Sequence, residues 1–317
     1  MGRTGRVSIR TRSIGWCLIS WALFASSGSL AKAVMVTGWS AATVTSVRIT
    51  LAVALLVPVV ALLRPRALRF RPTDLWLLLG YGVLGVAGVQ LLFFVAVARV
   101  PVGVAMVLVN LAPALVALWV RIVRRTRLAG RVWLGIGLAV VGLAFVAQLW
   151  QGARLDLLGI AGLGSAICSA GYFLLGEHGA SKHDPLGLTA AGLAIGAVVV
   201  GLFTPPWSLP SQLLSAPAEL SGVRVPVWLV LLVLAVVGTV LPYLAGLRAL
   251  RYLPSAPASV LVVVEPLVAA VLAWLLLGQS LGPAQIAGAV IMLIGAMLVQ
   301  LAMPETASTL PDRTQSR

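Results

Sequence analysis

Long runs of apolar residues alternate with short polar segments along the whole chain. Each run is about as long as a helix that crosses a bilayer, which takes about 20 residues. The runs cover residues 14–35, 40–63, 75–98, 101–120, 132–150, 156–177, 185–204, 226–247, 254–277 and 281–302. The pattern predicts ten transmembrane helices in an all-α polytopic membrane protein.

The second half of the chain repeats the first at a constant offset of 153 residues. Prolines and glycines hold this register without a gap: the offset pairs Pro101 with Pro254, Pro113 with Pro266, Gly85 with Gly238, Gly135 with Gly288 and Gly142 with Gly295. Matches among Leu, Val and Ala would mean little in so apolar a chain. Prolines and glycines in register indicate an internal duplication.

Each half holds five of the predicted helices. Because five is odd, the second half would enter the membrane from the opposite side, which predicts two inverted five-helix repeats. We expect a cytoplasmic N-terminal segment (1–13), a first repeat (14–150), a second repeat (156–302) and a cytoplasmic disordered tail (303–317). Inverted repeats are a recurrent plan of secondary transporters, because two similar halves can exchange conformations to open either side.

Composition supports a membrane protein and excludes a soluble one. The 317 residues are 60% hydrophobic and 10% charged, and a soluble domain could not bury so much apolar surface. The net charge of +15 comes from arginines in short loops, which indicates contact with anionic lipid and not with nucleic acid. Both cysteines lie in apolar runs, so neither a disulfide nor a metal site is predicted.

The basic residues also set the expected orientation. With the N-terminus inside, eighteen basic residues fall in cytoplasmic segments, and three fall on the other side: Arg99, Arg154 and Arg224. This bias predicts a multi-pass protein of the plasma (inner) membrane with both termini in the cytoplasm. The longest connection, about 205–225, is rich in Pro and Ser and is predicted to be a plain external linker.

Glu265 is the acidic residue that lies deepest inside an apolar run, and Pro266 follows it directly. A carboxylate at bilayer depth costs about 2.5–3.5 kcal/mol on insertion scales, so it needs a partner or a task. It would bind a cation or carry a proton, or it would pair with a basic residue to fix helix register. Pro266 and Pro113, its equivalent at the 153-residue offset, cannot donate a backbone hydrogen bond. Each would therefore break its helix and leave a carbonyl one turn earlier available to a ligand or water.

Two basic residues also lie within predicted spans. Arg48 is about 12 Å from the outer end of its helix at the helical rise per residue. At that depth its guanidinium suits a substrate carboxylate or an ion pair with Glu265. Lys32 is nearer the outer end of the first span, where it could contact substrate or extend its ammonium to the membrane interface.

Five uncharged residues complete the candidate substrate-binding set: Gln90, Asn110, Tyr243, Trp21 and Tyr172. The first three would line a polar cavity or bond between helices, and the two aromatic residues that follow would stack on substrate or pack. The sequence contains no Ser/His/Asp order in plausible positions, no metal-spaced cluster and no phosphate-binding glycine loop. We therefore expect no enzyme activity, no cofactor and no metal.

Patterns in four spans resemble the EamA family of the drug/metabolite transporter superfamily. They are Arg48 in the second span, Pro101 to Pro113 in the fourth, Leu241-Pro242-Tyr243 in the eighth, and Glu265-Pro266 with Leu277-Gly278 around the ninth. Ser29-Leu30-Ala31-Lys32 and Val100-Pro101 are similar to the threonine/homoserine exporter branch. The resemblance implies a ten-helix exporter with a central cavity, which moves amino acids or related metabolites outward, in many members with protons.

We therefore expect a secondary active transporter that exports a small amino acid by alternating access. Arg48 would meet the substrate carboxylate, and Glu265 would meet its ammonium group or a coupling proton. The expected partners are a small-molecule substrate and the lipid bilayer, with protons and a second copy in a homodimer as further candidates. Two alternatives stay open. One is a carrier of drugs, nucleosides or nucleotide-linked sugars, and the other is a non-transporting membrane scaffold.

Overall fold

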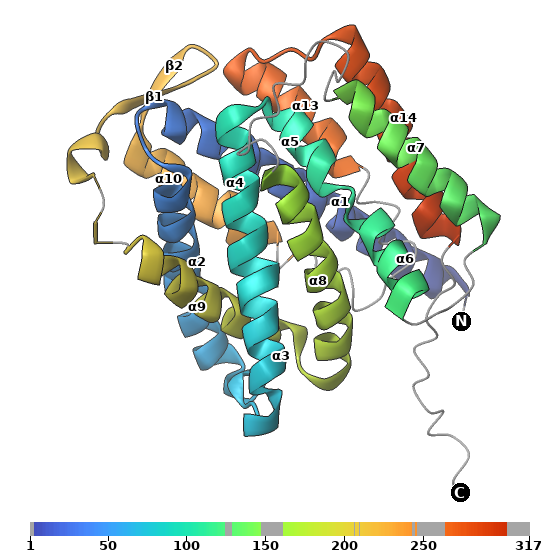
Figure 1. The fold of residues 1–317 in the computed structure, drawn as a ribbon. Coiled ribbons are helices and arrows are strands. Elements are labelled where there is room, and N and C mark those ends of the chain that lie inside the picture. Colours follow the sequence, from blue (N-terminus) through green and yellow to red (C-terminus); the bar gives the residue numbers. More distant parts are fainter. Residues whose placement is uncertain are drawn as a thin grey trace, which may run out of the picture.

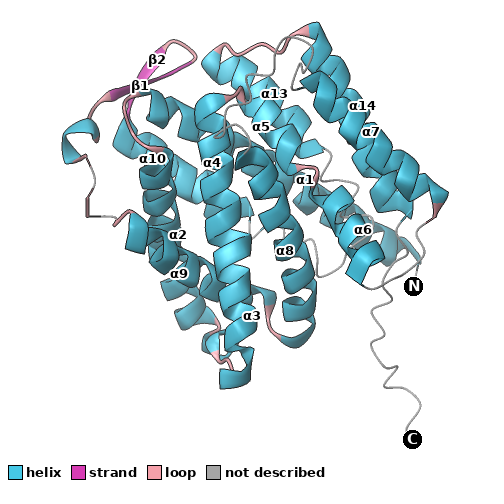
Figure 2. Ribbon diagram, in the orientation of Figure 1, coloured by secondary structure: helices cyan, strands magenta, loops and turns pink. Residues whose placement is uncertain are grey.

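The computed structural model describes residues 3–123, 129–146, 161–205, 207–208, 210–242, 245 and 264–302. Helices fill most of this part of the chain (Figure 2). In the first half they are α1 (Arg3–Val36), α2 (Ala41–Leu63), α3 (Leu75–Gly80), η3 (Tyr81–Gly88), α4 (Val89–Arg99), α5 (Val102–Val109), α6 (Ala112–Val123) and α7 (Gly130–Val146). In the second half they are α8 (Ala161–Lys182), α9 (Pro185–Phe203), α10 (Val227–Ala235), η6 (Val236–Val240), α13 (Val264–Leu277) and α14 (Pro283–Ala302).

Each of the ten predicted ranges contains helix among the described residues. Four helical segments are long enough and apolar enough to cross a membrane: Leu18–Val36, Ala41–Leu63, Pro72–Arg99 and Pro185–Phe203. The other apolar helices in the described ranges are shorter. Short 3-10 turns, η1 (Pro65–Leu68) and η2 (Pro72–Asp74), connect α2 to α3. The first helix begins at Arg3, well before the predicted start at residue 14.

The fourth predicted range is two helices, not one. α5 ends at Val109 and α6 begins at Ala112, so Pro113 lies in the first turn of α6. A proline tolerates that position because its missing N–H has no intrahelical partner there. In the break, Asn110 donates from its side-chain nitrogen to the carbonyl of Met106 at 3.0 Å. Pro266 likewise lies in the first turn of α13.

Two segments of the bundle are π-helical, and they lie at equivalent places in the two halves. η3 covers Tyr81–Gly88, and η6 covers Val236–Val240. Moved back by the repeat offset, η6 falls on residues 83–87, inside η3. A π-helix widens the turn and disturbs the regular hydrogen-bond ladder, and such segments occur often at functional sites. The two π-helical segments therefore lie at the same position of the sequence repeat.

Helices of the two halves pack against each other in matching pairs. α7 and α14, the last helices of the halves, lie side by side (Figure 1). A methyl group added to Gly135 would lie 2.6 Å from the carbonyl oxygen of Gly295, and one added to Gly142 would lie 2.6 Å from that of Gly288. Because the contacts run in opposite sequence directions, the two helices are antiparallel. Glycine at these positions permits the close backbone approach.

Other contacts between the halves show the same exchange of partners. α1 packs on α13 and η6, while α8, which begins the second half, packs on α5, α6 and η3. α2 packs on α9 and on η6, and α9 packs on η3. The contacts are therefore equivalent at the repeat offset. The contact of α1 with η6 corresponds to that of α8 with η3, and the contact of α2 with η6 corresponds to that of α9 with η3.

The connection before α10 is not the plain linker that its Pro and Ser content predicts. It holds a 3-10 turn (Ser211–Leu213) and a two-stranded antiparallel hairpin, β1 (Pro217–Leu220) and β2 (Val223–Pro226). Ser221 and Gly222 form the turn with φ of +53° and +76°, the left-handed pair that a two-residue hairpin turn needs. Fully buried Ala218 packs the hairpin onto the cluster that α1 contributes to. The fold is mostly helical, with this small sheet as its exception.

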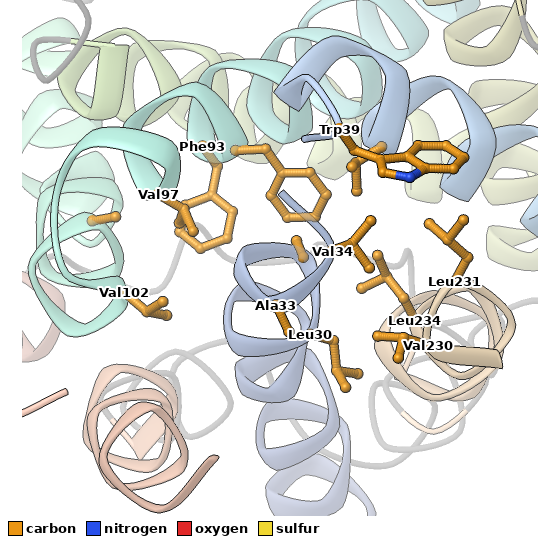
Figure 3. Packing of buried hydrophobic residues seen from close by; sticks show 14 of the residues in the cluster. Leu30, Ala33, Val34, Trp39, Phe93, Val97, Val102, Val230, Leu231 and Leu234 are labelled. Carbon is orange, nitrogen blue, oxygen red and sulfur yellow. The ribbon is translucent and has the colours of Figure 1, made fainter. Parts of the chain in front are cut away.

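Apolar side chains fill the interior of the bundle and also cover much of its outside. Figure 3 shows part of the largest buried cluster, in which Leu30 and Val34 of α1 meet Phe93 of α4 and Leu234 of α10. Many large apolar residues are nevertheless exposed, including Leu62, Trp76, Trp133, Phe203 and Trp274. An exterior of this kind is expected where lipid, not water, surrounds the protein.

Candidate functional site

Arg48 of α2 contacts η6, an element of the second half of the chain. It is 3% exposed, and its Nε donates to Thr239 Oγ1 at 2.6 Å while Nη2 donates to the carbonyl oxygen of Gly238 at 2.7 Å. Its guanidinium also lies over the ring of Phe94, 5.0 Å from the centroid, within cation–π range. Arg48 of α2 thus holds the π-helical segment η6 of the other half. Thr239 in turn donates to the carbonyl of Leu234 at 3.3 Å.

Gln90 is buried on the same helix that carries Phe94. The two residues are four apart in α4, so their side chains share one helix face. Gln90 is 6% exposed, and both polar atoms of its side-chain amide lack a hydrogen-bond partner among the described residues. A buried amide in that state costs about 1–3 kcal/mol, and native structures rarely leave one without a reason. The face of α4 that points at Arg48 therefore carries unused hydrogen-bonding capacity.

Trp21 adds a second polar atom of this kind. Its indole Nε1 is buried and has no partner in the part of the chain that the structure describes. The ring packs near Phe24 at 6.0 Å between centroids. The neighbouring Ser20 donates to the carbonyl of Pro242 at 2.7 Å, which joins α1 to the residues that follow η6. Trp21 is therefore positioned on the helix that meets both η6 and α13.

Glu265 lies in the first turn of α13, directly before Pro266, and is partly buried. A carboxylate in the first turn interacts favourably with the helix dipole. No hydrogen bond or ion pair reaches its carboxyl from any residue within the described ranges. In particular, the predicted alternative of an ion pair with Arg48 is not formed there, since Arg48 donates to η6 instead. Within the described ranges, the Glu265 carboxyl therefore has no structural partner.

Lys32 has a partly structural position. Its Nζ donates to the carbonyl oxygens of Val97 at 2.7 Å and Ala98 at 2.9 Å. These carbonyls belong to the last turn of α4, whose acceptors have no intrahelical donor, and a cation is favourable there. Lys32 therefore ties the end of α1 to the end of α4 and does not reach the centre of the bundle.

The remaining predicted residues divide into packing residues and one that lies outside the described part. Tyr172 of α8 lies 5.3 Å from Tyr81 between ring centroids and fills the space over Gly85, so it packs α8 onto η3. Asn110, 7% exposed, is used in the helix break. Tyr243 lies outside the described residues.

Two partners of Arg48 were missed by the sequence predictions. Thr239 is an isolated hydroxyl in an apolar run, and Gly238 already belonged to the repeat pairs. Both signals were present, but neither indicated an arginine partner about 190 residues away.

The comparisons with known proteins agree with this architecture. The sequence profile of the EamA-like transporter family matches residues 11–148 and again residues 157–301. The chain is 32% identical over 307 residues to the threonine/homoserine exporter RhtA of Escherichia coli (strain K12), covering 95% of this chain and 92% of the relative. It is 28% identical over 225 residues to the uncharacterized transporter YyaM of Bacillus subtilis (strain 168), covering 68% and 70%.

One solved crystal structure shares the fold. It superposes with a TM-score of 0.55 at 20% sequence identity and covers 91% of this chain and 98% of that chain. The resemblance drawn from the sequence motifs is thereby confirmed, and relatives that are named transporters agree with the expectation of a non-enzyme. This chain belongs to the EamA-like transporter family and is a multi-pass membrane transporter.

Proposed function

We propose that this protein is a secondary active transporter that exports a small amino acid, of the threonine or homoserine type, across the plasma membrane. The substrate class rests on the relative named as a threonine/homoserine exporter, which matches nearly the whole chain. The observation that carries the transport site is the buried Gln90 amide, with two unpartnered polar atoms on the face of α4 that contacts Arg48 through Phe94. Such a group is suited to a polar ligand that binds and dissociates.

We further propose alternating access between two inverted repeats, with both termini in the cytoplasm. The double match of the family profile, the π-helical segments at the repeat offset and the exchanged glycine contacts of α7 and α14 all support it. Two similar halves that meet in exchanged pairs can adopt two related arrangements, each open to one side. The excess of basic residues in the segments assigned to the cytoplasm supports the orientation.

Within this mechanism Glu265 would meet the substrate ammonium or a coupling proton, because its carboxyl has no protein partner among the described residues. Gln90 and Trp21 would supply uncharged hydrogen bonds. Arg48 has two of its donor nitrogens occupied by η6, which favours a positioning role over direct contact with the substrate carboxylate. A substrate that bound Nε or Nη2 would have to replace those bonds.

Uptake of labelled threonine and homoserine into proteoliposomes, with and without an imposed pH gradient, tests the proposal. Wild-type protein should transport at least one of them, and the gradient should stimulate the flux if protons are coupled. Gln90→Leu and Glu265→Gln should each lower turnover in protein that stays folded in detergent. Absence of flux for any amino acid from folded protein would refute amino-acid transport and would move the search to drugs, nucleosides and sugars.

A further inference from the structure

A hollow of about 650 Å³ opens at the end of the bundle where α1 and α13 finish. Three segments line it: the end of α1 from Lys32 to Thr37, the hairpin from Pro217 to Gly222, and the end of α13 with the residues that follow it to Gln279. In the orientation proposed above, this is the external end. The hollow is separate from the buried contact between Arg48 and η6.

Hydrogen bonds join two of the three segments that line the hollow, the hairpin and the end of α13. At the tip of the hairpin, Ser221 donates from its backbone nitrogen to the carbonyl of Leu276 at 2.9 Å, and from Oγ to the carbonyl of Leu275 at 2.6 Å. Gln279 accepts from the backbone nitrogen of Val102 at 3.1 Å through Oε1. The hairpin therefore caps α13, and α13 is tied to the start of α5. These hydrogen bonds hold the hairpin and the end of α13 in place beside the hollow.

Among the described residues that line the hollow, Lys32 is a cation and Glu219 is an anion. Two of the three N–H groups of the Lys32 ammonium bind α4 carbonyls, which leaves the third for a ligand. Glu219 is exposed, and its carboxylate has no hydrogen bond or ion pair with any described residue. The two charges line the same hollow but form no ion pair, so they lie more than 4.0 Å apart. That separation leaves room for a molecule that bridges them.

We propose that this hollow is an exit site that binds a free amino acid as a zwitterion, with its carboxylate at Lys32 and its ammonium at Glu219. The inference rests on the proposed export of amino acids and adds a second substrate-binding site to the export pathway. Lys32 lies eleven residues beyond Trp21 on the same helix, about 17 Å at the helical rise. Substrate released from the centre of the bundle would therefore pass along α1 to this site before it leaves. The amide nitrogen of Gln279 is available as a further donor, because only its oxygen is used.

The test uses right-side-out membrane vesicles preloaded with labelled threonine, with unlabelled competitors added outside. External threonine that occupies the exit site should slow efflux, and its half-inhibitory concentration reports the affinity of the hollow. Glu219→Gln should raise that concentration by about 5-fold, the upper value for an exposed ion pair. Arg224→Gln is the matched control, since Arg224 is opposite Glu219 in the hairpin but does not line the hollow.

Two analogues separate the contributions of the charges. 3-Hydroxybutyrate lacks the ammonium, and threonine methyl ester lacks the carboxylate, so wild-type protein should be inhibited more weakly by both than by threonine. In Glu219→Gln the advantage of threonine over 3-hydroxybutyrate should disappear, while its advantage over the ester should remain. Equal half-inhibitory concentrations for wild type and Glu219→Gln would overturn the exit site while efflux itself still supports the proposed function.

The same chemistry exists in a zwitterionic lipid head group, so a second arm distinguishes the sources. In proteoliposomes without phosphatidylethanolamine, the effect of Glu219→Gln on inhibition by threonine should persist. If it disappears there, the occupant is the lipid head group and the free amino acid is excluded. If wild-type vesicles show no threonine efflux at all, the proposed function fails and the exit site fails with it.

Discussion

Replacing Gly142 with alanine would insert a methyl group into the closest contact between α7 and α14. The added carbon would lie 2.6 Å from the carbonyl oxygen of Gly288 and 2.6 Å from the amide nitrogen of Met292. Ordinary contacts begin at 3.4 Å, so the helices would have to separate locally by about 0.8 Å. Both neighbours are backbone atoms and cannot rotate away, unlike the end of a flexible side chain.

The cost follows from what holds these helices together. Between lipid-facing helices the close approach of backbones is a main source of attraction, and overpacking typically costs about 1–3 kcal/mol. Gly137 lies on the same helix, and a methyl group added there has nothing within 4 Å. Both substitutions gain the same helix propensity, about 1 kcal/mol relative to glycine, so the difference between them isolates the clash. Gly142→Ala should therefore be about 1–3 kcal/mol less stable than Gly137→Ala.

The stability difference between the two variants is measured by thermal unfolding of the purified proteins in one detergent. Loss of the monodisperse fraction reports unfolding. The reciprocal substitution Gly295→Ala, which would place a methyl group 2.5 Å from the carbonyl oxygen of Gly135, should behave like Gly142→Ala. If Gly142→Ala unfolded at the same temperature as Gly137→Ala, the antiparallel glycine contact would not be a close contact in the protein. The support that this contact gives to the two-fold arrangement would then be lost.

Three further substitutions test individual contacts. Arg48→Lys should destabilise the protein by about 1–3 kcal/mol in the same unfolding assay, because the single nitrogen of a lysine cannot reproduce the planar fork whose Nε and Nη2 reach Thr239 and Gly238 separately. An unchanged midpoint would contradict the positioning role. Gln90→Leu should keep or raise that midpoint while proteoliposome transport falls, since it removes a buried amide without a described partner; a lower midpoint would indicate a structural role. Ser221→Ala should weaken the attachment of the hairpin to α13 by about 0.5–1.5 kcal/mol. It should therefore speed cleavage of the hairpin by a protease added on the external side. An unchanged cleavage rate would show that the side-chain hydrogen bond does not hold the hairpin.

The helices and the register of the proposed duplication could be predicted from the sequence because both depend on strong local signals. Apolar length marks spans, and prolines and glycines in register mark the repeat, as with Gly135 and Gly288. The close approach at these glycines was not predicted as a specific pair, since it depends on which helix faces which.

The partners of the charged residues could not be predicted for the same reason. The sequence predicts a substrate carboxylate or Glu265 as the partner of Arg48. In the structure its Nε and Nη2 donate to η6, whose π-helical geometry leaves no distinct mark in the sequence. Lys32 was placed near the outer end of its span, but its contacts with α4 carbonyls need the packing of two helices. The hairpin was missed because Pro and Ser content outweighed the short β-branched strand from Val223 to Pro226.

The sequence repeat extends to prolines and glycines but not to charges. At the repeat offset, the counterpart of each charged candidate is uncharged: Pro185 for Lys32, Gly201 for Arg48 and Ala112 for Glu265. Two identical five-helix chains, inserted in opposite directions, could form the same exchanged contacts, but they would carry every one of these charges twice. In the inverted repeat proposed above, one polypeptide joins the two halves, so each of these ionic groups occurs once and a single substrate would meet a single, asymmetric set of groups.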